Sequence, residues 1–327
     1  MKTEDIPMNK TSKNTTNNKR MEALNQITEQ LEASVREFMS GNKYKDFLTK
    51  MSQFHNYSLN NQLLISLQRP DATLCASFTK WKDMERMVKK GEKGIKIICP
   101  TPYKKQKIEE VKDPKTGKTE LLEDGSPKKQ IVEHTYINYK IGYIFDISQT
   151  DGKPLPTLST PLEGNLDNTQ KELKNALMQI SPVPVSFLPI KGDANGYYHL
   201  QDKEIVVDSN ISERQSLKTL IHEISHALLH DKEIVPDAPT DSNTREVQAE
   251  SIAYVVSQYF GMDTSEYSFG YISGWSSDKN VQELKSSLEI IRNTSNDIIN
   301  QIEQILTPKK SIDQEVTEKA LHKRRCM

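Results

Sequence analysis

The stretch LIHEISHALLH, residues 220–230, restricts the fold and chemistry of this chain more than any other segment. It places His222 and His226 four residues apart, with Glu223 directly after the first histidine. Residues four apart lie on one face of an α-helix, so both imidazoles can reach a single ion. Zinc accepts imidazole nitrogens, and a glutamate next to the first ligand can act as general base on a water at the metal. The pattern therefore predicts a helix with a metal site, with Glu223 as the catalytic residue.

The surroundings of this pattern decide between a metal site and an ordinary helix. Three fixed residues arise by chance at roughly the per-cent level in a chain of this length. The helix, however, is apolar enough to lie in a core, where unpartnered polar groups are costly. Its apolar positions are Leu220, Ile221, Ile224, Ala227 and Leu228. This context favours a metal site.

A third ligand is expected on a following helix, because a catalytic zinc takes three protein ligands and leaves a fourth position open. The segment TREVQAESIAYVVSQYF offers Glu246 and Glu250, one turn apart and opposite an apolar face. Spacing alone does not decide whether Glu246 or Glu250 is the ligand, and either residue can instead be a solvated charge on the helix surface. His230 is expected outside the metal shell, because one helix rarely gives three ligands to a tetrahedral ion.

Amide hydrolysis at such a site needs a hydrogen-bond donor for the developing oxyanion, besides the metal. Tyr197, Tyr198 and His199 precede the histidine helix on a predicted strand. They are candidates for this role, and exposed strand side chains explain them equally well.

Composition limits the class of protein. The chain has 327 residues, of which 27% are charged and 35% hydrophobic, as expected for a globular chain of about two domains. Cys75, Cys99 and Cys326 form neither a disulfide framework nor a thiolate metal site. No apolar run is long enough to cross a membrane, and the N-terminus lacks a signal-peptide pattern. A soluble cytoplasmic protein without a membrane partner is expected.

A basic patch lies in the N-terminal half, although the net charge of the chain is only −1. Residues 80–107 contain ten Lys or Arg and three acidic residues, an excess of seven positive charges that can follow a phosphate backbone. Aromatic side chains are interleaved with these charges, and bases of single strands stack on such rings. The residues selected as DNA contacts are Tyr57, Asn60, Asn61, Trp81, Lys82, Lys89, Lys90 and Lys93. A solvated basic face around buried rings is the alternative, and the residues alone favour it.

The predicted fold class is α+β with two domains. Residues 1–20 are read as a disordered tail, 21–150 as an α+β domain, 151–168 as a linker and 307–327 as a basic tail. Residues 169–306 are predicted to form a mainly helical domain with a small sheet. Residues 104–129, rich in Lys, Glu, Pro and Gly, are expected to form a long hairpin tip or surface insertion.

Two sets of motifs resemble a known family. The C-terminal run GYYHLQDKEIVVD…TLIHEISHALLH…REVQAESIAYVV resembles the ImmA/IrrE type of zincin, and more closely the metallopeptidase domain of ArdC-type antirestriction proteins. The N-terminal run YSLNNQLLI…PDAT…VKKGEKGI, followed by FDISQT, is similar to the ArdC-type N-terminal domain, which in that family binds single-stranded DNA. The resemblance implies that Glu246 is the third ligand and that Glu250 orients a ligand histidine.

The resemblance implies an antirestriction protein of a mobile genetic element. It would bind single-stranded DNA and hold one Zn²⁺ per chain at a metallopeptidase site acting on an unknown protein substrate. His/His/Glu sites also accept manganese, cobalt or nickel. Two alternatives remain: a DNA-binding protein with a catalytically silent zincin domain, and an ImmA-like regulatory protease that cleaves a repressor.

Overall fold

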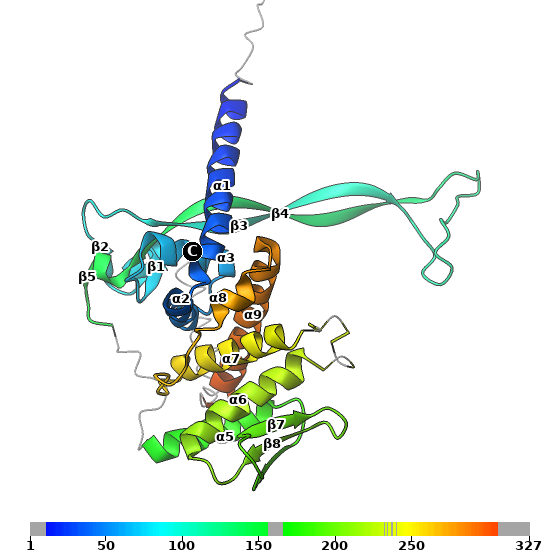
Figure 1. The fold of residues 1–327 in the computed structure, drawn as a ribbon. Coiled ribbons are helices and arrows are strands. Elements are labelled where there is room, and N and C mark those ends of the chain that lie inside the picture. The colour runs from blue at the N-terminus through cyan, green and yellow to red at the C-terminus, as the bar shows by residue number, and fades with distance from the viewer. Residues whose placement is uncertain are drawn as a thin grey trace, which may run out of the picture.

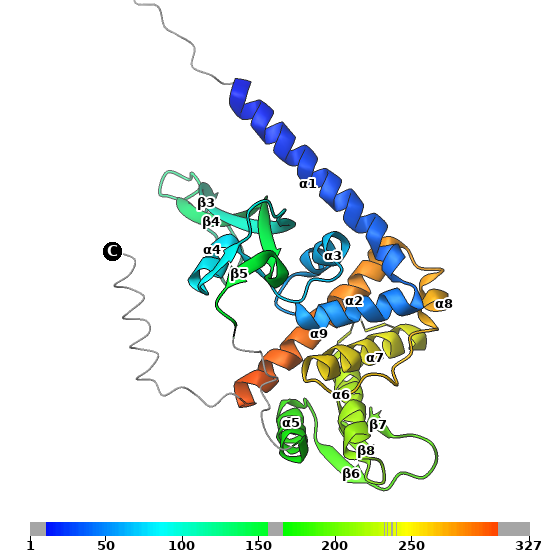
Figure 2. The same ribbon diagram turned by 90° about the vertical axis from the view of Figure 1, so that its left-hand side faces the viewer.

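The computed structural model describes residues 11–155 and 166–306, except positions 232, 234, 237 and 240. The fold is mixed α+β, as predicted: an N-terminal half of helices and antiparallel strands, and a mostly helical C-terminal half with a three-stranded sheet (Figures 1 and 2). Residues 1–10 of the predicted N-terminal tail (1–20), the predicted basic tail at 307–327 and most of the predicted linker lie outside the described residues.

The N-terminal half begins with three helices and continues into strands. Its elements are α1 (Thr11–Phe38), α2 (Gly41–Gln53), α3 (Leu59–Gln68), β1 (Cys75–Ser77), α4 (Phe78–Asp83), β2 (Arg86–Val88), β3 (Ile95–Glu110), β4 (Lys129–Asp146), the 3-10 helix η1 (Ile147–Gln149) and β5 (Thr150–Gly152). The antiparallel order β1-β4-β3 forms one sheet, and β2 pairs with β5.

The β3–β4 hairpin is the most extended feature of this half. Sixteen consecutive residue pairs join the strands, from Ile95–Ile144 to Glu110–Lys129, and the distal part runs out sideways from the helices (Figure 1). Side chains alternate between faces, so Ile95, Ile97 and Ile144 reach the core at the base. The prediction of a hairpin tip in residues 104–129 is therefore confirmed in kind: β3 continues into this segment as far as Glu110, and residues 111–128 form the tip.

The C-terminal half positions the histidine helix between a small sheet and further helices. Its elements are α5 (Leu166–Ile180), β6 (Val185–Leu188), β7 (Gly196–His199), β8 (Glu204–Asp208), α6 (Glu213–Leu229), α7 (Ser242–Tyr259), α8 (Ile272–Ser276) and α9 (Val281–Leu306). The sheet order is β6-β8-β7, with β6 parallel and β7 antiparallel to β8, so β7 is an edge strand.

One hydrophobic core joins the helices of both halves. It contains Leu31, Tyr44 and Leu63 from α1–α3 as well as Leu220 and Ile299 from α6 and α9. A second, smaller core lies under the β1-β4-β3 sheet. The predicted division near residue 150 therefore separates chain segments whose helices share packing.

Polar contacts reinforce this packing between α2 and α7. The Tyr44 hydroxyl lies 2.8 Å from Ser251 Oγ, and the Thr49 hydroxyl lies 2.8 Å from the Tyr254 hydroxyl. Ser251 directly follows Glu250, one of the two glutamates considered for the metal. The N-terminal helices thus support the helix that carries the predicted third ligand.

Two helical boundaries differ from the sequence prediction. Helix α1 begins at Thr11, inside the predicted disordered tail, because a polar extension of an amphipathic helix leaves no hydrophobic periodicity to read. Helix α2 begins at Gly41, although a glycine shortly after an amphipathic stretch is a typical signal for the end of a helix. At both positions the tertiary fold determines where the helix begins, and the local sequence pattern does not predict it.

A buried carboxylate ties the β7–β8 turn to the end of α6. Asp231 is 1% exposed and accepts hydrogen bonds from Lys203 Nζ at 2.7 Å and the Tyr198 hydroxyl at 2.6 Å. These donors lower the Asp231 pKa to about 2. A carboxyl group whose pKa is lower in the folded than in the unfolded state stabilises the fold at any pH above its unfolded pKa, which is about 3.9 for Asp. This stabilisation is lost as the pH falls towards the pKa of the folded state.

The Asp231→Asn substitution is therefore expected to destabilise the chain near neutral pH. The wild-type advantage should shrink between about pH 4 and pH 2. Urea unfolding of both proteins across this range measures the effect. An advantage that does not change with pH would contradict the ionised pair.

Candidate metal centre

Local sequence explains why the histidine helix starts and lies where it does. The Ser212 hydroxyl caps α6 by accepting a hydrogen bond from the Gln215 amide at 3.2 Å. Strand β7 passes close to the helix at Gly196. A Cβ at that position would meet Thr219 Cγ2 at 2.6 Å and the Val206 carbonyl oxygen at 2.9 Å. A residue without a side chain is needed for this approach, which brings the edge strand to the helix face that carries Glu223.

Three donor atoms converge at the centre. His222 Nε2 lies 3.0 Å from His226 Nε2, and Glu246 Oε2 and Oε1 lie 3.4 and 3.5 Å from these two nitrogens respectively. A tetrahedral zinc ion with bonds of about 2.0–2.1 Å separates its ligands by roughly 3.3 Å. His222, His226 and Glu246 therefore form a group that fits a metal ion.

Electrostatics supports the same group. Burial alone would lower the pKa of His222, but the carboxylates of Glu246 and Glu250 outweigh it and raise this pKa to about 10. The two histidines in turn lower the pKa of Glu246. The ionised Glu246 carboxylate therefore favours positive charge at His222, as expected for donors arranged around a cation.

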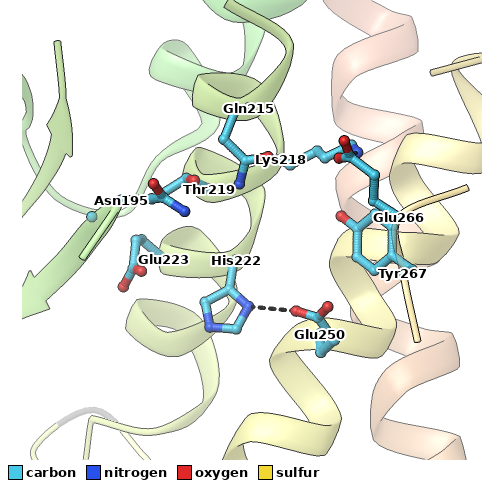
Figure 3. A pocket seen from close by; sticks show the side chains of 10 residues that line it. Asn195, Gln215, Lys218, Thr219, His222, Glu223, Glu250, Glu266 and Tyr267 are labelled. Atoms are coloured by element: carbon cyan, nitrogen blue, oxygen red, sulfur yellow. Dashed lines mark hydrogen bonds and ion pairs between the residues drawn. The ribbon is translucent and has the colours of Figure 1, made fainter. Parts of the chain in front are cut away.

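The two glutamates of α7 contact different nitrogens of His222. Glu246 faces the converging Nε2 atoms, whereas Glu250 Oε2 lies 3.4 Å from His222 Nδ1 (Figure 3). Glu250 is thus placed to hold the imidazole from behind, an arrangement that orients metal-ligating histidines in other proteins.

Glu223 lies beside the centre in a confined position. Its side chain is 7% exposed, and burial raises the pKa of its carboxyl group. Cavities of about 310 and 430 Å³ open on either side, and both are lined by Gly196, His222 and Glu223. Figure 3 shows the first of these cavities. A buried carboxylate with a raised pKa at an open cleft suits a general base.

His230 belongs to the centre more closely than the sequence indicated. Its Nδ1 lies 2.8 Å from His226 Nδ1, and its Nε2 lies 3.0 Å from Gln248 Oε1. The Gln248 amide donates to Ser287 Oγ at 3.2 Å. If His226 Nε2 faces a metal, its Nδ1–H donates to His230, whose Nε2–H donates to Gln248. The same i, i+4 spacing that reveals His222 and His226 could have suggested this contact.

Replacing His230 by alanine is expected to weaken zinc binding by about 10- to 100-fold, because outer partners of ligand histidines have effects of this size. Competition with a chromophoric chelator measures the affinity. His199→Ala, which alters an exposed histidine paired with Asp202, is the matched control. Equal affinities for the two variants would contradict the positioning role of His230.

The three side chains considered as oxyanion donors, Tyr197, Tyr198 and His199, lie on β7. Two of them already contact carboxylates. The Tyr198 hydroxyl donates to Asp231, and His199 Nδ1 pairs with Asp202 at 2.9 Å. Tyr197 is 42% exposed and lines the 430 Å³ cavity. Sequence reasoning missed Arg245 in this cavity, and Tyr271, which with Glu246 lines an adjacent cavity of about 600 Å³.

Several of the predicted DNA contacts have structural roles. Trp81 is fully buried and its indole N–H donates to the Phe145 carbonyl at 2.8 Å, so its ring is not accessible to a base. Asn61 is 8% exposed and makes two hydrogen bonds with the Ile98 backbone. The Tyr57 hydroxyl donates to the Cys75 carbonyl at 2.9 Å.

The remaining predicted contacts lie at the surface or beside a cavity. Lys82, Lys90 and Lys93 are exposed, and Lys89 is exposed but donates to the Ser148 carbonyl at 3.0 Å. Asn60 lines a cavity of about 680 Å³ between α1, α3 and the base of the hairpin, as do Tyr57, Asn61 and Tyr139. Exposed rings on the hairpin, including Tyr103 and Tyr139, were not selected from the sequence.

The fold and site define a class of protein: an α+β domain packed on a helical domain that holds a His–His–Glu metal-binding group. Two family models match these parts. The N-terminal domain of anti-restriction factor ArdC matches residues 17–143, and the IrrE N-terminal-like domain, a peptidase family, matches residues 179–291. The chain thus contains an ArdC N-terminal domain followed by an IrrE N-terminal-like domain.

Individual similar proteins match over most of this chain. An uncharacterized protein of Bacillus anthracis, pXO2-81, is 33% identical over 283 residues, which is 78% of this chain but 46% of that protein. The chain thus spans about half the length of this relative. The metal-free and Mn(II)-bound crystal structures of the antirestriction ArdC protein from the R388 plasmid align with TM-scores of 0.43 and 0.42. They are 17% and 15% identical, over 76% and 78% of this chain and 85% and 86% of theirs. Within the described residues no helix is long and apolar enough to cross a membrane.

Proposed function

We propose that the chain is an antirestriction protein that binds single-stranded DNA and hydrolyses a peptide bond at its metal centre. One observation carries the hydrolytic part: His222, His226 and Glu246 converge within 3.5 Å of one another, beside the buried Glu223 and an open cleft. A purely structural metal site has no need of Glu223 or of open space next to its ligands.

The mechanism assigns separate tasks to the residues of the cleft. His222, His226 and Glu246 would hold a zinc ion, which would supply Lewis acidity to polarise a carbonyl and to make water more acidic. Glu223 takes the proton of the attacking water and passes it to the leaving amine. Strand β7 is an edge strand, so its free backbone groups can align an extended peptide along the cleft.

Metal-dependent hydrolysis of a quenched-fluorescence peptide library tests this activity. Cleavage by the zinc-loaded chain should stop after chelation and return when zinc is added back. An intact zinc-loaded chain that cleaves no peptide in a diverse library would favour the silent-domain alternative. Cleavage confined to one repressor-like sequence would favour a regulatory protease.

Binding of single-stranded DNA is supported by the surface of the N-terminal half. Lys82, Lys90 and Lys93 are exposed and form no ion pair with any residue that the structure describes. The hairpin adds a ring pair of Tyr103 and Tyr136, whose centroids lie 5.6 Å apart, and Lys107 Nζ lies 5.5 Å above the Tyr136 ring. Positive charge interleaved with rings suits unpaired bases and their phosphates. Such binding is the proposed means by which the protein protects entering DNA from restriction.

Replacing Lys90 and Lys93 together by glutamine is expected to weaken binding of a labelled single-stranded oligonucleotide. It should also reduce the salt dependence of log K by about 0.7 for each phosphate that these lysines neutralise. Fluorescence anisotropy over a salt series measures both effects. Lys171→Gln, which removes an exposed charge from α5, is the control, and indistinguishable curves for the two proteins would place the DNA elsewhere.

A further inference from the structure

Arg245 has no anionic partner among the described residues, although it is partly withdrawn from solvent. It lies in the first turn of α7, directly before the metal-group residue Glu246, and its side chain is half-buried. It lines the 430 Å³ cavity together with His222, His226 and Glu223. In the part of the chain that the structure describes, no residue forms an ion pair or side-chain hydrogen bond with it. A guanidinium that has no carboxylate partner among the described residues, and that lies in a cleft partly withdrawn from solvent, is suited to an incoming anion.

The acidic neighbours of Arg245 are engaged elsewhere. Asp241, one turn earlier, caps α7 by accepting a hydrogen bond from the Thr244 amide at 2.7 Å. The Glu246 carboxylate faces His222 and His226. Neither acid neutralises the guanidinium within ion-pair distance.

The cavity on the other side of His222 has the opposite character. Its cation, Lys218, is 6% exposed and pairs with Glu266 Oε2 at 3.0 Å, and Glu250 adds a further carboxylate (Figure 3). The two sides of the centre therefore differ in charge, and only the Arg245 side offers a cation without a carboxylate partner among the described residues.

We propose that Arg245 determines specificity by binding a carboxylate of the substrate, an acidic side chain or a chain end, in the 430 Å³ cavity. This inference rests on the proposed peptidase function and names the chemistry of its substrate. Tyr197 and Leu200 are 42% and 56% exposed at the same cavity and provide apolar surface for the carbon atoms that carry the carboxylate. A bidentate guanidinium–carboxylate contact supplies both orientation and affinity.

Two hydroxamate ligands distinguish a failure of the proposed Arg245 role from a failure of the proposed metal site. Butyryl hydroxamate binds through its metal-chelating group alone, whereas succinyl hydroxamate carries an additional carboxylate at the end of a similar chain. Isothermal titration of the zinc-loaded full chain measures both, without any need for a cleavable substrate. Arg245→Gln removes the guanidinium charge, and Arg245→Lys keeps the positive charge but not the paired N–H donors. Arg214→Gln is the control, because it removes a guanidinium from α6 outside both cavities.

The wild type is expected to bind the succinyl compound at least about tenfold more tightly than the butyryl compound. Arg245→Gln should lose this preference while binding the butyryl compound normally, Arg245→Lys should retain part of it, and Arg214→Gln all of it. Equal binding of both compounds by the wild type, or a preference that survives Arg245→Gln, would overturn the role of Arg245 and leave the metal site standing. If neither compound binds the zinc-loaded wild type, the proposal of an open metal site is contradicted, and the proposed role of Arg245 is contradicted with it.

Discussion

Replacing His222 by alanine is expected to abolish stoichiometric zinc binding. His222 contributes one of the three converging donor atoms, and its Nδ1 contacts Glu250. Its loss removes a ligand and leaves Glu250 without its histidine. The affinity should therefore fall by more than the roughly 10- to 100-fold that follows loss of an outer partner. Elemental analysis of proteins purified side by side should give about one zinc per wild-type chain and none per variant.

His134→Ala is the matched control for this measurement. His134 lies on the hairpin, pairs with Glu109 at 2.7 Å and is remote in sequence from the centre. The control should keep its zinc, and circular dichroism should establish that all three proteins are folded. Stoichiometric zinc in the His222 variant would show that the converging group is not the metal site.

The two histidines of the metal group could be predicted from the sequence, because the geometry of a single helix determines their positions. The i, i+4 spacing of His222 and His226 makes their convergence a property of a single helix. The choice between Glu246 and Glu250 is different, because it depends on how α7 crosses α6. Spacing left this choice open and the family resemblance implied Glu246. In the packed structure Glu246 meets the converging Nε2 atoms, while Glu250 reaches the opposite nitrogen of His222.

The side chains available for the proposed DNA contacts were less predictable, because a ring in a basic segment is either exposed for stacking or part of a core. Trp81 and Tyr103 both lie near lysines in the sequence, yet one is fully buried and the other is 44% exposed. The register of a long hairpin decides which side chains leave the core, and a pattern of Lys, Pro and Gly does not reveal that register. The unpaired state of Arg245 among the described residues likewise depends on the positions of Asp241 and Glu246 in space.

Replacing Glu223 by glutamine is expected to leave zinc binding intact and to slow peptide hydrolysis by about 10²- to 10⁴-fold, the usual contribution of a general base. The substitution keeps the size of the side chain but removes the carboxylate that accepts the proton. Glu223 is not among the converging donors, so the metal content should not change. Single-turnover cleavage of a library-selected peptide, together with zinc content, measures both effects.

The same variant separates the two proposed activities of the chain. Helix α6 contributes Glu223, whereas the exposed lysines lie near β2 in the N-terminal half, so single-stranded DNA binding should be unchanged. If Glu223→Gln loses protection of entering DNA in cells while it still binds zinc and DNA, hydrolysis is part of the proposed antirestriction function. If protection is unchanged after hydrolysis is lost, protection depends on DNA binding alone, and the metal centre serves another substrate.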